Sequence, residues 1–133
     1  MLTISSKAPS AVRALTELAR RQGDGPVPIG DIARHRGIPV QFLESVFGAL
    51  RRAGVLQSQR GVKGGYSFAR APADLTVLEV VEVLDGPVGV EASGFDAIWP
   101  EAVEAVRAVL GGVTIAELAE REAREAGAAM YYI

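Results

Sequence analysis

A basic, glycine-rich segment is the part of this chain whose residue types and spacing most clearly indicate chemistry. Residues 55–68 read Val-Leu-Gln-Ser-Gln-Arg-Gly-Val-Lys-Gly-Gly-Tyr-Ser-Phe, two short β-prone runs around a turn that carries Arg60 and Lys63. Glycines let such a turn approach another molecule closely, and its cations attract phosphates. Arg51 and Arg52 end a helical segment just before it. A helix followed by a small basic hairpin predicts a winged helix-turn-helix that binds DNA.

Net charge divides the chain into two halves of opposite sign. All 133 residues together carry −2, which alone argues against binding to nucleic acid. Residues 1–70 hold 11 Lys and Arg against 4 Asp and Glu, a net +7, whereas residues 71–133 hold 3 against 12, a net −9. A phosphate backbone would be attracted to the first half and repelled by the second. Charge alone leaves open that both halves are ordinary solvated surfaces.

The residues that metal sites and enzymes use are scarce. The chain has no cysteine, which excludes disulfides, thiol nucleophiles and cysteine-bound iron–sulfur clusters, and His35 alone cannot complete a zinc site. The glycine turn lacks the lysine and hydroxyl pair of a nucleotide-binding loop. We expect no metal, no cofactor, no catalytic residue and no enzyme activity. Without a membrane-spanning run or a signal-peptide pattern, we also expect a cytoplasmic protein.

Hydrophobic spacing and turn residues predict a mostly α fold with a small β-hairpin. Helices are expected over residues 10–21, 29–37, 39–53, 77–85, 97–110 and 115–125. Gly37 and Pro39 mark a tight connection between the second and third helices, which form the helix-turn-helix pair. Thr76 and Thr114 are expected to cap the helices that follow them.

The third predicted helix has two different faces. Its apolar positions recur at helical spacing and form one side, namely Leu43, Val46, Phe47 and Leu50. The opposite side is a stripe of Gln41, Ser45, Gly48 and Arg52, with Glu44 beside it. Small polar groups followed by a cation can enter a major groove and reach base edges, although an ordinary solvent-exposed face has the same composition.

A longer pattern resembles a known family. It runs through residues 42–56, Phe-Leu-Glu-x-x-Phe-x-x-Leu-Arg-Arg-Ala-Gly-Val-Leu, and through residues 60–66, Arg-Gly-x-x-Gly-Gly-Tyr. It continues over residues 75–81, Leu-Thr-Val-x-Glu-Val-Val, with a looser match at Trp99 and residues 114–118. With these motifs the chain resembles the IscR-type family of bacterial winged-helix transcription regulators, also called the Rrf family.

The resemblance implies a sequence-specific DNA-binding regulator, a homodimer and a repressor. Residues 1–86 would be the DNA-binding domain, and residues 87–133 a connecting loop and dimerisation helices. The DNA-binding residues that match by position are Ser6, Lys7, Val40, Gln41, Glu44, Ser45, Arg51, Arg52, Arg60, Gly61, Lys63 and Gly64. The helix over 97–110 would form the dimer through Trp99, Val103, Val106 and Leu110.

One departure from the family pattern concerns its signal. Many members hold an iron–sulfur cluster through three cysteines in the loop before the dimerisation helix, and the corresponding residues 87–95 contain none. The chain therefore resembles the cluster-free branch of the family. Its effector, a small molecule or a protein, does not follow from the resemblance.

Two questions stay open at the level of sequence. Glu44 would repel phosphates, yet its carboxylate can accept a hydrogen bond from cytosine N4, so it is either a specificity residue or a plain surface charge. The acidic second half and the apolar tail over residues 128–133 are also compatible with a protein-interaction module that regulates an enzyme or another regulator. We favour the DNA-binding interpretation.

Overall fold

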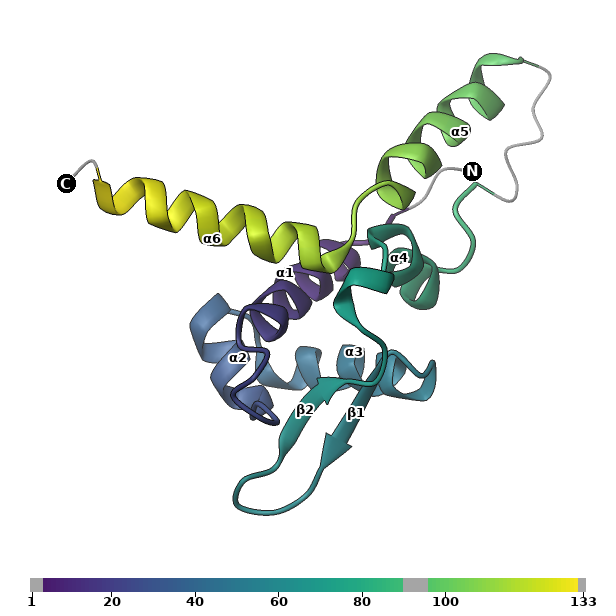
Figure 1. Ribbon diagram of the computed structural model, residues 1–133. Coiled ribbons are helices and arrows are strands. Elements are labelled where there is room, and N and C mark those ends of the chain that lie inside the picture. Colours follow the sequence, from purple (N-terminus) through teal and green to yellow (C-terminus); the bar gives the residue numbers. More distant parts are fainter. Residues whose placement is uncertain (1–3, 90–95, 132–133) are drawn as a thin grey trace.

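The computed structural model describes residues 4–89 and 96–131. Over these residues the elements are α1 (Lys7–Arg20), α2 (Ile29–Arg36), α3 (Val40–Arg52), β1 (Leu56–Gln59), β2 (Gly65–Phe68), a 3-10 turn η1 (Pro72–Asp74), α4 (Val77–Asp85), α5 (Ile98–Gly111) and α6 (Ile115–Tyr131). The first three helices and the antiparallel hairpin form a head, from which α5 and α6 diverge in different directions (Figure 1). This arrangement confirms the mostly helical class with one small hairpin.

Local signals placed most helix ends correctly. Gly37 ends α2 in the left-handed conformation at φ 63°, and the Thr76 and Thr114 hydroxyls accept hydrogen bonds from the Glu79 and Glu117 amides, both at 3.1 Å.

Two helix ends were predicted wrongly. α1 begins at Lys7 rather than at residue 10, since Pro9 in a first turn interrupts no helical hydrogen bond. α6 ends at Tyr131 rather than at residue 125, because alanine and methionine favour helix and the single Gly127 does not stop it.

One hydrophobic core is shared by the four helices α1, α2, α3 and α4, by the hairpin and by the start of α6. The predicted apolar face of α3 is buried, and its Phe47 ring meets Tyr66 of the hairpin edge-on at 5.1 Å. Ile115 of α6 is fully buried in the same core. Backbone hydrogen bonds hold this junction, from Val77 to Val113 and from Ile115 to Leu75, both at 2.9 Å. The domain boundary at residue 86 stays a prediction. α6 lies beyond that boundary in the sequence but packs against the head.

The hairpin is fastened to the head through the connection between α1 and α2. Val27 and Tyr66 exchange two backbone hydrogen bonds, of 2.9 and 2.8 Å. Gly65 makes this contact possible, because its φ is 155° and a Cβ there would lie 2.3 Å from the Val27 carbonyl oxygen. A Cβ on Gly64 would likewise lie 2.2 Å from the Gln59 carbonyl oxygen, within the hairpin.

α5 packs more loosely than the other helices. None of its residues is buried, although Val106 and Leu110 pack against a second apolar cluster of Ala8, Val81 and Val88. Within the part of the chain that the structure describes, no helix is long and apolar enough to cross a membrane.

Substitution of Gly65 tests how the hairpin is attached. Gly65→Ala should lower the free energy of unfolding by at least about 2 kcal/mol, because alanine is strained at this φ and its methyl group would collide with Val27. Gly127→Ala is the control, since nothing lies within 4 Å of the added carbon, and it should be neutral or stabilising by about 0.5–1 kcal/mol. Urea denaturation followed by circular dichroism measures both, and equal effects would contradict this account of the hairpin.

Candidate DNA-binding interface

The outward face of α3 carries four of the predicted DNA-binding residues. Val40 is 41% exposed, and Gln41, Glu44 and Ser45 are exposed beside it over the first turns of the helix. The structure therefore brings these four together on one face, opposite the buried one. Their contacts with DNA stay a prediction.

Cations occupy the C-terminal end of the same helix. Arg51 and Arg52 are exposed there, and the Arg52 side chain lies over Gly48, whose Cβ position would be 3.3 Å from the guanidinium Nη1. Polar groups thus precede positive charge along α3, as its sequence predicts.

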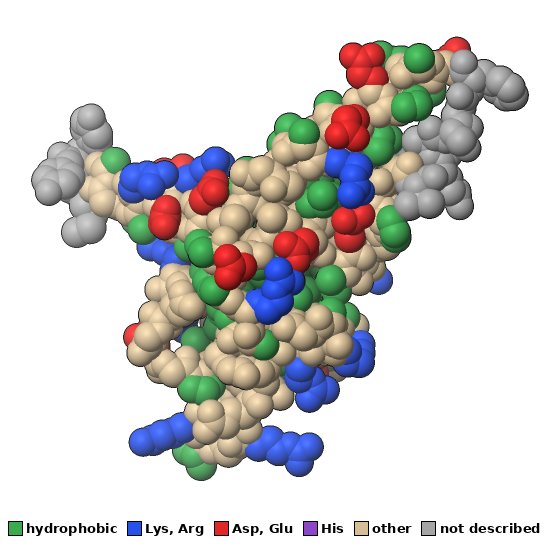
Figure 2. All heavy atoms as spheres, turned by 45° about the vertical axis from the view of Figure 1, so that its right-hand side comes forward, with side chains coloured by type: hydrophobic (Ala, Val, Ile, Leu, Met, Phe, Trp, Pro, Cys, Tyr) green, Lys and Arg blue, Asp and Glu red, His purple; other side chains and the backbone are tan. Residues whose placement is uncertain are grey.

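The hairpin turn forms a projecting wing. Arg60, Gly61 and Lys63 are exposed, and Val62 at the turn is fully so, at 105%. Gly61 has φ 110° and its carbonyl accepts the Gly64 amide at 3.0 Å, so glycine at this corner shapes the turn. Figure 2 shows Lys and Arg side chains on both sides of the hairpin tip, whereas Asp and Glu side chains gather over the upper part of this face.

Ion pairing separates two groups of cations. Within residues 4–89 and 96–131, ion pairs with carboxylates involve Arg20, Arg21, Arg34, Arg36, Arg70 and Arg107, and the His35 imidazole lies 3.6 Å from Glu17. In that same part of the chain, none involves Arg51, Arg52, Arg60 or Lys63, and the same holds for Lys7, Arg13, Arg121 and Arg124. Hydrogen bonds from Arg70 and Arg107 hold the pKa values of Glu79 and Glu82 below their usual range, so these pairs are fully charged at neutral pH. Positive charge is therefore left available on the wing and the end of α3.

Ser6 and Lys7 lie exposed at the start of α1. The sequence analysis did not single out Asp85, which holds the preceding residue, Ser5. Asp85, at the end of α4, accepts hydrogen bonds from the Ser5 amide at 2.8 Å and from its hydroxyl at 2.6 Å. A contact between residues 80 positions apart leaves no local signal in the sequence.

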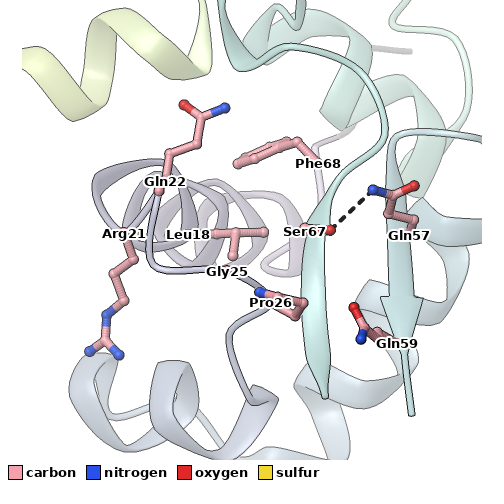
Figure 3. Close-up of a pocket in the computed structure, with 10 residues that line it drawn as sticks. Leu18, Arg21, Gln22, Gly25, Pro26, Gln57, Gln59, Ser67 and Phe68 are labelled. Atoms are coloured by element: carbon pink, nitrogen blue, oxygen red, sulfur yellow. Dashed lines mark hydrogen bonds between the residues drawn. The ribbon is translucent and has the colours of Figure 1, made fainter. Parts of the chain in front are cut away.

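A groove of about 490 Å³ lies behind the wing (Figure 3). Leu18, Pro26 and Phe68 form its apolar part, and the Gln57 amide crosses the hairpin to donate a 3.2 Å hydrogen bond to the Ser67 hydroxyl. The groove lies between the wing strands and the connection from α1 to α2, so that connection supports the wing from behind.

The predicted dimerisation residues divide into two groups. Trp99 is 59% exposed, whereas Val106 and Leu110 pack within the protomer and the Val103 side chain lies beside Gly89. Ile98 and Val109, which the sequence analysis did not single out, are 57% and 67% exposed. Partner contacts of all these residues stay a prediction.

These features define a winged helix-turn-helix DNA-binding protein, and comparison with known proteins identifies its family. The profile of the Rrf2 family, described as iron-dependent transcriptional regulators, matches residues 4–121, so the chain belongs to this family. The HTH-type transcriptional regulator CymR of Bacillus subtilis is 31% identical over 99% of this chain and 100% of that protein. The regulator IscR of Xenorhabdus nematophila is 32% identical over 91% of this chain and 81% of that protein.

Solved structures agree with these sequence relationships. CymR, the global cysteine regulator of B. subtilis, superposes with a TM-score of 0.83 at 32% identity, covering 91% of this chain and 98% of that one. IscR of T. potens gives 0.79 at 34% identity, over 94% and 90%. The protein is a helix-turn-helix transcriptional regulator of the Rrf2 family.

The iron in the family description finds no cysteine ligands in this chain. An iron–sulfur cluster is held mainly by thiolates, and the chain has no cysteine. Among the described residues, no three His, Asp or Glu side chains gather where they could hold a metal ion. Residues 90–95, in the loop that corresponds to the family's cluster loop, lie outside the described residues. The side chains of this chain do not fit an iron–sulfur cluster.

The available cations of the wing give a test with a matched control. Replacing Arg60 and Lys63 together by alanine should lower DNA affinity by at least about one order of magnitude. It should reduce the slope of log affinity against log salt by about two for each bound head, or about four for a dimer bound through both heads, since two phosphate contacts are lost per head. Arg121 and Arg124 are exposed on α6, and their double alanine variant changes the net charge equally. Fluorescence anisotropy over a salt series measures both variants, and equal losses would show that net charge alone matters.

Proposed function

We propose that this protein is a homodimeric, sequence-specific transcriptional repressor that acts in the cytoplasm without an iron–sulfur cluster and has no enzyme activity. The observation that carries the proposal is the set of unpaired cations on α3 and the wing, in a chain of net charge −2 whose other described arginines are mostly paired. Unpaired cations on one side of a protein are what a phosphate backbone binds.

The DNA contacts follow from the shape of the head. Val40, Gln41, Glu44 and Ser45 would read base edges in the major groove, where an α-helix fits. Arg51 and Arg52 would meet phosphates at the end of that helix. Ser6 and Lys7 would add phosphate contacts from the start of α1.

The wing would enter the neighbouring minor groove. Arg60 and Lys63 carry its charge, while Gly61 and Gly64 give the turn the shape that lets its backbone approach the DNA.

α5 would form the dimer. Ile98, Trp99 and Val109 present exposed apolar surface on a helix without buried residues, and such a helix is stabilised by a partner. Val103, Val106 and Leu110 would support this helix, with the last two pressing it against its own head. Two heads on one dimer would bind two half-sites of an operator.

Release from DNA would depend on an effector other than a cysteine-bound cluster. Of the two relatives named above, CymR is matched over its whole length, and its structure is described as that of a cysteine regulator. We infer a small molecule or a protein as the signal for this chain, because the thiolate donors of the cluster are missing.

Sequence reading by α3 can be tested on DNA that the protein itself selects. Wild-type protein is used to enrich its binding site from random duplexes, and Gln41→Ala and Glu44→Ala are then compared on that site and on unrelated DNA. Each variant should lose about 1–3 kcal/mol of discrimination at one base pair, and Glu44→Ala should bind unrelated DNA no more weakly. Glu125→Ala, an exposed change on α6, should leave discrimination intact. Unchanged discrimination in both α3 variants would refute this role of the helix.

The dimer can be tested by one charge on α5. Val109→Glu should produce monomers at micromolar concentration in sedimentation velocity, because a carboxylate would be desolvated at an apolar interface. Ala123→Glu adds the same charge at an exposed alanine of α6 and should leave the dimer intact. A wild-type protein that sediments as a monomer would refute the dimer itself.

A further inference from the structure

An ion cluster joins α6 to the helix-turn-helix on the side of the head away from the wing. Its members come from α1, α2 and α6 and are Glu17, Arg20, Arg21, His35, Arg36 and Glu122. In Figure 1, α6 passes above α1 and α2, whereas the hairpin projects from the opposite end of the head. The DNA-binding residues named above do not belong to this cluster.

Arg36, the last residue of α2, is the centre of the ion cluster. Its Nη1 and Nη2 donate to the two carboxylate oxygens of Glu122 at 2.9 and 2.7 Å, and its Nε donates to Glu17 at 3.0 Å. Such bidentate pairs between an arginine and a carboxylate fix the relative orientation of the two side chains as well as their distance. The Arg13 guanidinium donates to the Arg36 carbonyl oxygen at 2.9 Å. Arg36 is thus held by side chains of α1 and α6.

Burial makes these contacts different from ordinary surface pairs. The side chains of Arg36 and Glu17 are only 12% and 5% exposed, and that of Glu122 is 32% exposed. The hydrogen bond from Arg36 holds the pKa of Glu122 below its usual range. Burial alone would raise the pKa of Glu17, but the hydrogen bond from Arg21 and the charges of His35 and Arg36 lower it. Both carboxylates are therefore ionised at neutral pH.

The position of Arg36 connects this cluster to the recognition helix. Gly37 follows it in the left-handed conformation, the buried Ile38 donates its amide to the Ala33 carbonyl at 2.9 Å, and α3 begins at Val40. The connection is short and contains Pro39, so a shift at the end of α2 is transmitted to the start of α3. The exposed residues at that start are those expected to read bases.

We propose that Arg36 and Glu122 are positioning residues for sequence recognition. Through this pair, α6 fixes the end of α2 and with it the angle at which the first turn of α3 meets the major groove. The C-terminal helix then contributes to which DNA sequence is bound without touching DNA. This inference rests on the proposed role of α3 as the reading helix.

The test compares Glu122→Gln with Glu120→Gln, a change at an exposed position of the same helix outside the cluster. The probes are the duplex selected by the wild-type protein and an unrelated duplex of equal length. Glu122→Gln should lower affinity for the selected duplex by about tenfold, in the range of residues that act through a network, and leave both the salt slope and the affinity for unrelated DNA unchanged. Glu120→Gln should behave as wild type.

The pattern of loss separates positioning from general destabilisation. A partly unfolded variant would lose affinity for both duplexes in equal proportion, so equal losses overturn the proposal. Arg36→Lys is the second variant, because it keeps the charge but not the bidentate geometry. It should lose less affinity than Glu122→Gln, and only for the selected duplex. Backbone amide NMR shifts of Gly37, Ile38, Val40 and Gln41 in the DNA-free protein should move in Glu122→Gln and not in Glu120→Gln.

Two further outcomes distinguish this inference from the proposed function. If Gln41→Ala and Glu44→Ala lose discrimination while Glu122→Gln and Arg36→Lys keep it, the positioning role is wrong and α3 remains the reading helix. If none of the four loses discrimination, the proposed reading role of α3 itself fails, and the positioning role with it.

Discussion

The burial of one face of α3 is the constraint on which the rest of this structure depends. Phe47 and its apolar neighbours fix the helix against α1, α4 and the hairpin, and the Phe47 ring holds Tyr66 at the base of the wing. Because the apolar face is fixed, the opposite face must point outward with Gln41, Glu44 and Ser45 in a constant arrangement. The proposed reading surface is therefore a consequence of packing, since the same contacts that bury one side of the helix orient the other.

Pairing of charges adds a second level of organisation. A chain with slightly more acidic than basic residues has to keep some cations unpaired if it is to bind DNA. Arg36, Arg70 and Arg107 form ion pairs with carboxylates, whereas the cations of the wing and of the end of α3 form none among the described residues. The resulting field would orient the head toward DNA and hold the acidic helices away from it.

The family relationship and the missing cysteines lead to one conclusion about regulation. The fold is close to those of CymR and IscR, with TM-scores of 0.83 and 0.79, so the DNA-binding architecture is common to all three. The thiolate donors for an iron–sulfur cluster are absent from this chain. We infer that the signal of this chain is not a thiolate-bound cluster, whereas the DNA-binding fold is kept because the head is held by its own core and by α6.

The sequence by itself determined the elements and the family. Local spacing predicts the buried face of α3, and the glycine and threonine signals at Gly37, Thr76 and Thr114 predict helix ends, because hydrogen bonds and backbone conformations within a few residues set them. It missed where α1 begins and α6 ends, since Pro9 in a first turn interrupts no helical hydrogen bond and the single Gly127 does not stop a helix. Only the tertiary structure decided that Asp85 holds Ser5, that Val27 fastens the wing, and that Glu122 meets Arg36, since these pairs lie far apart along the chain and arise from how whole helices pack.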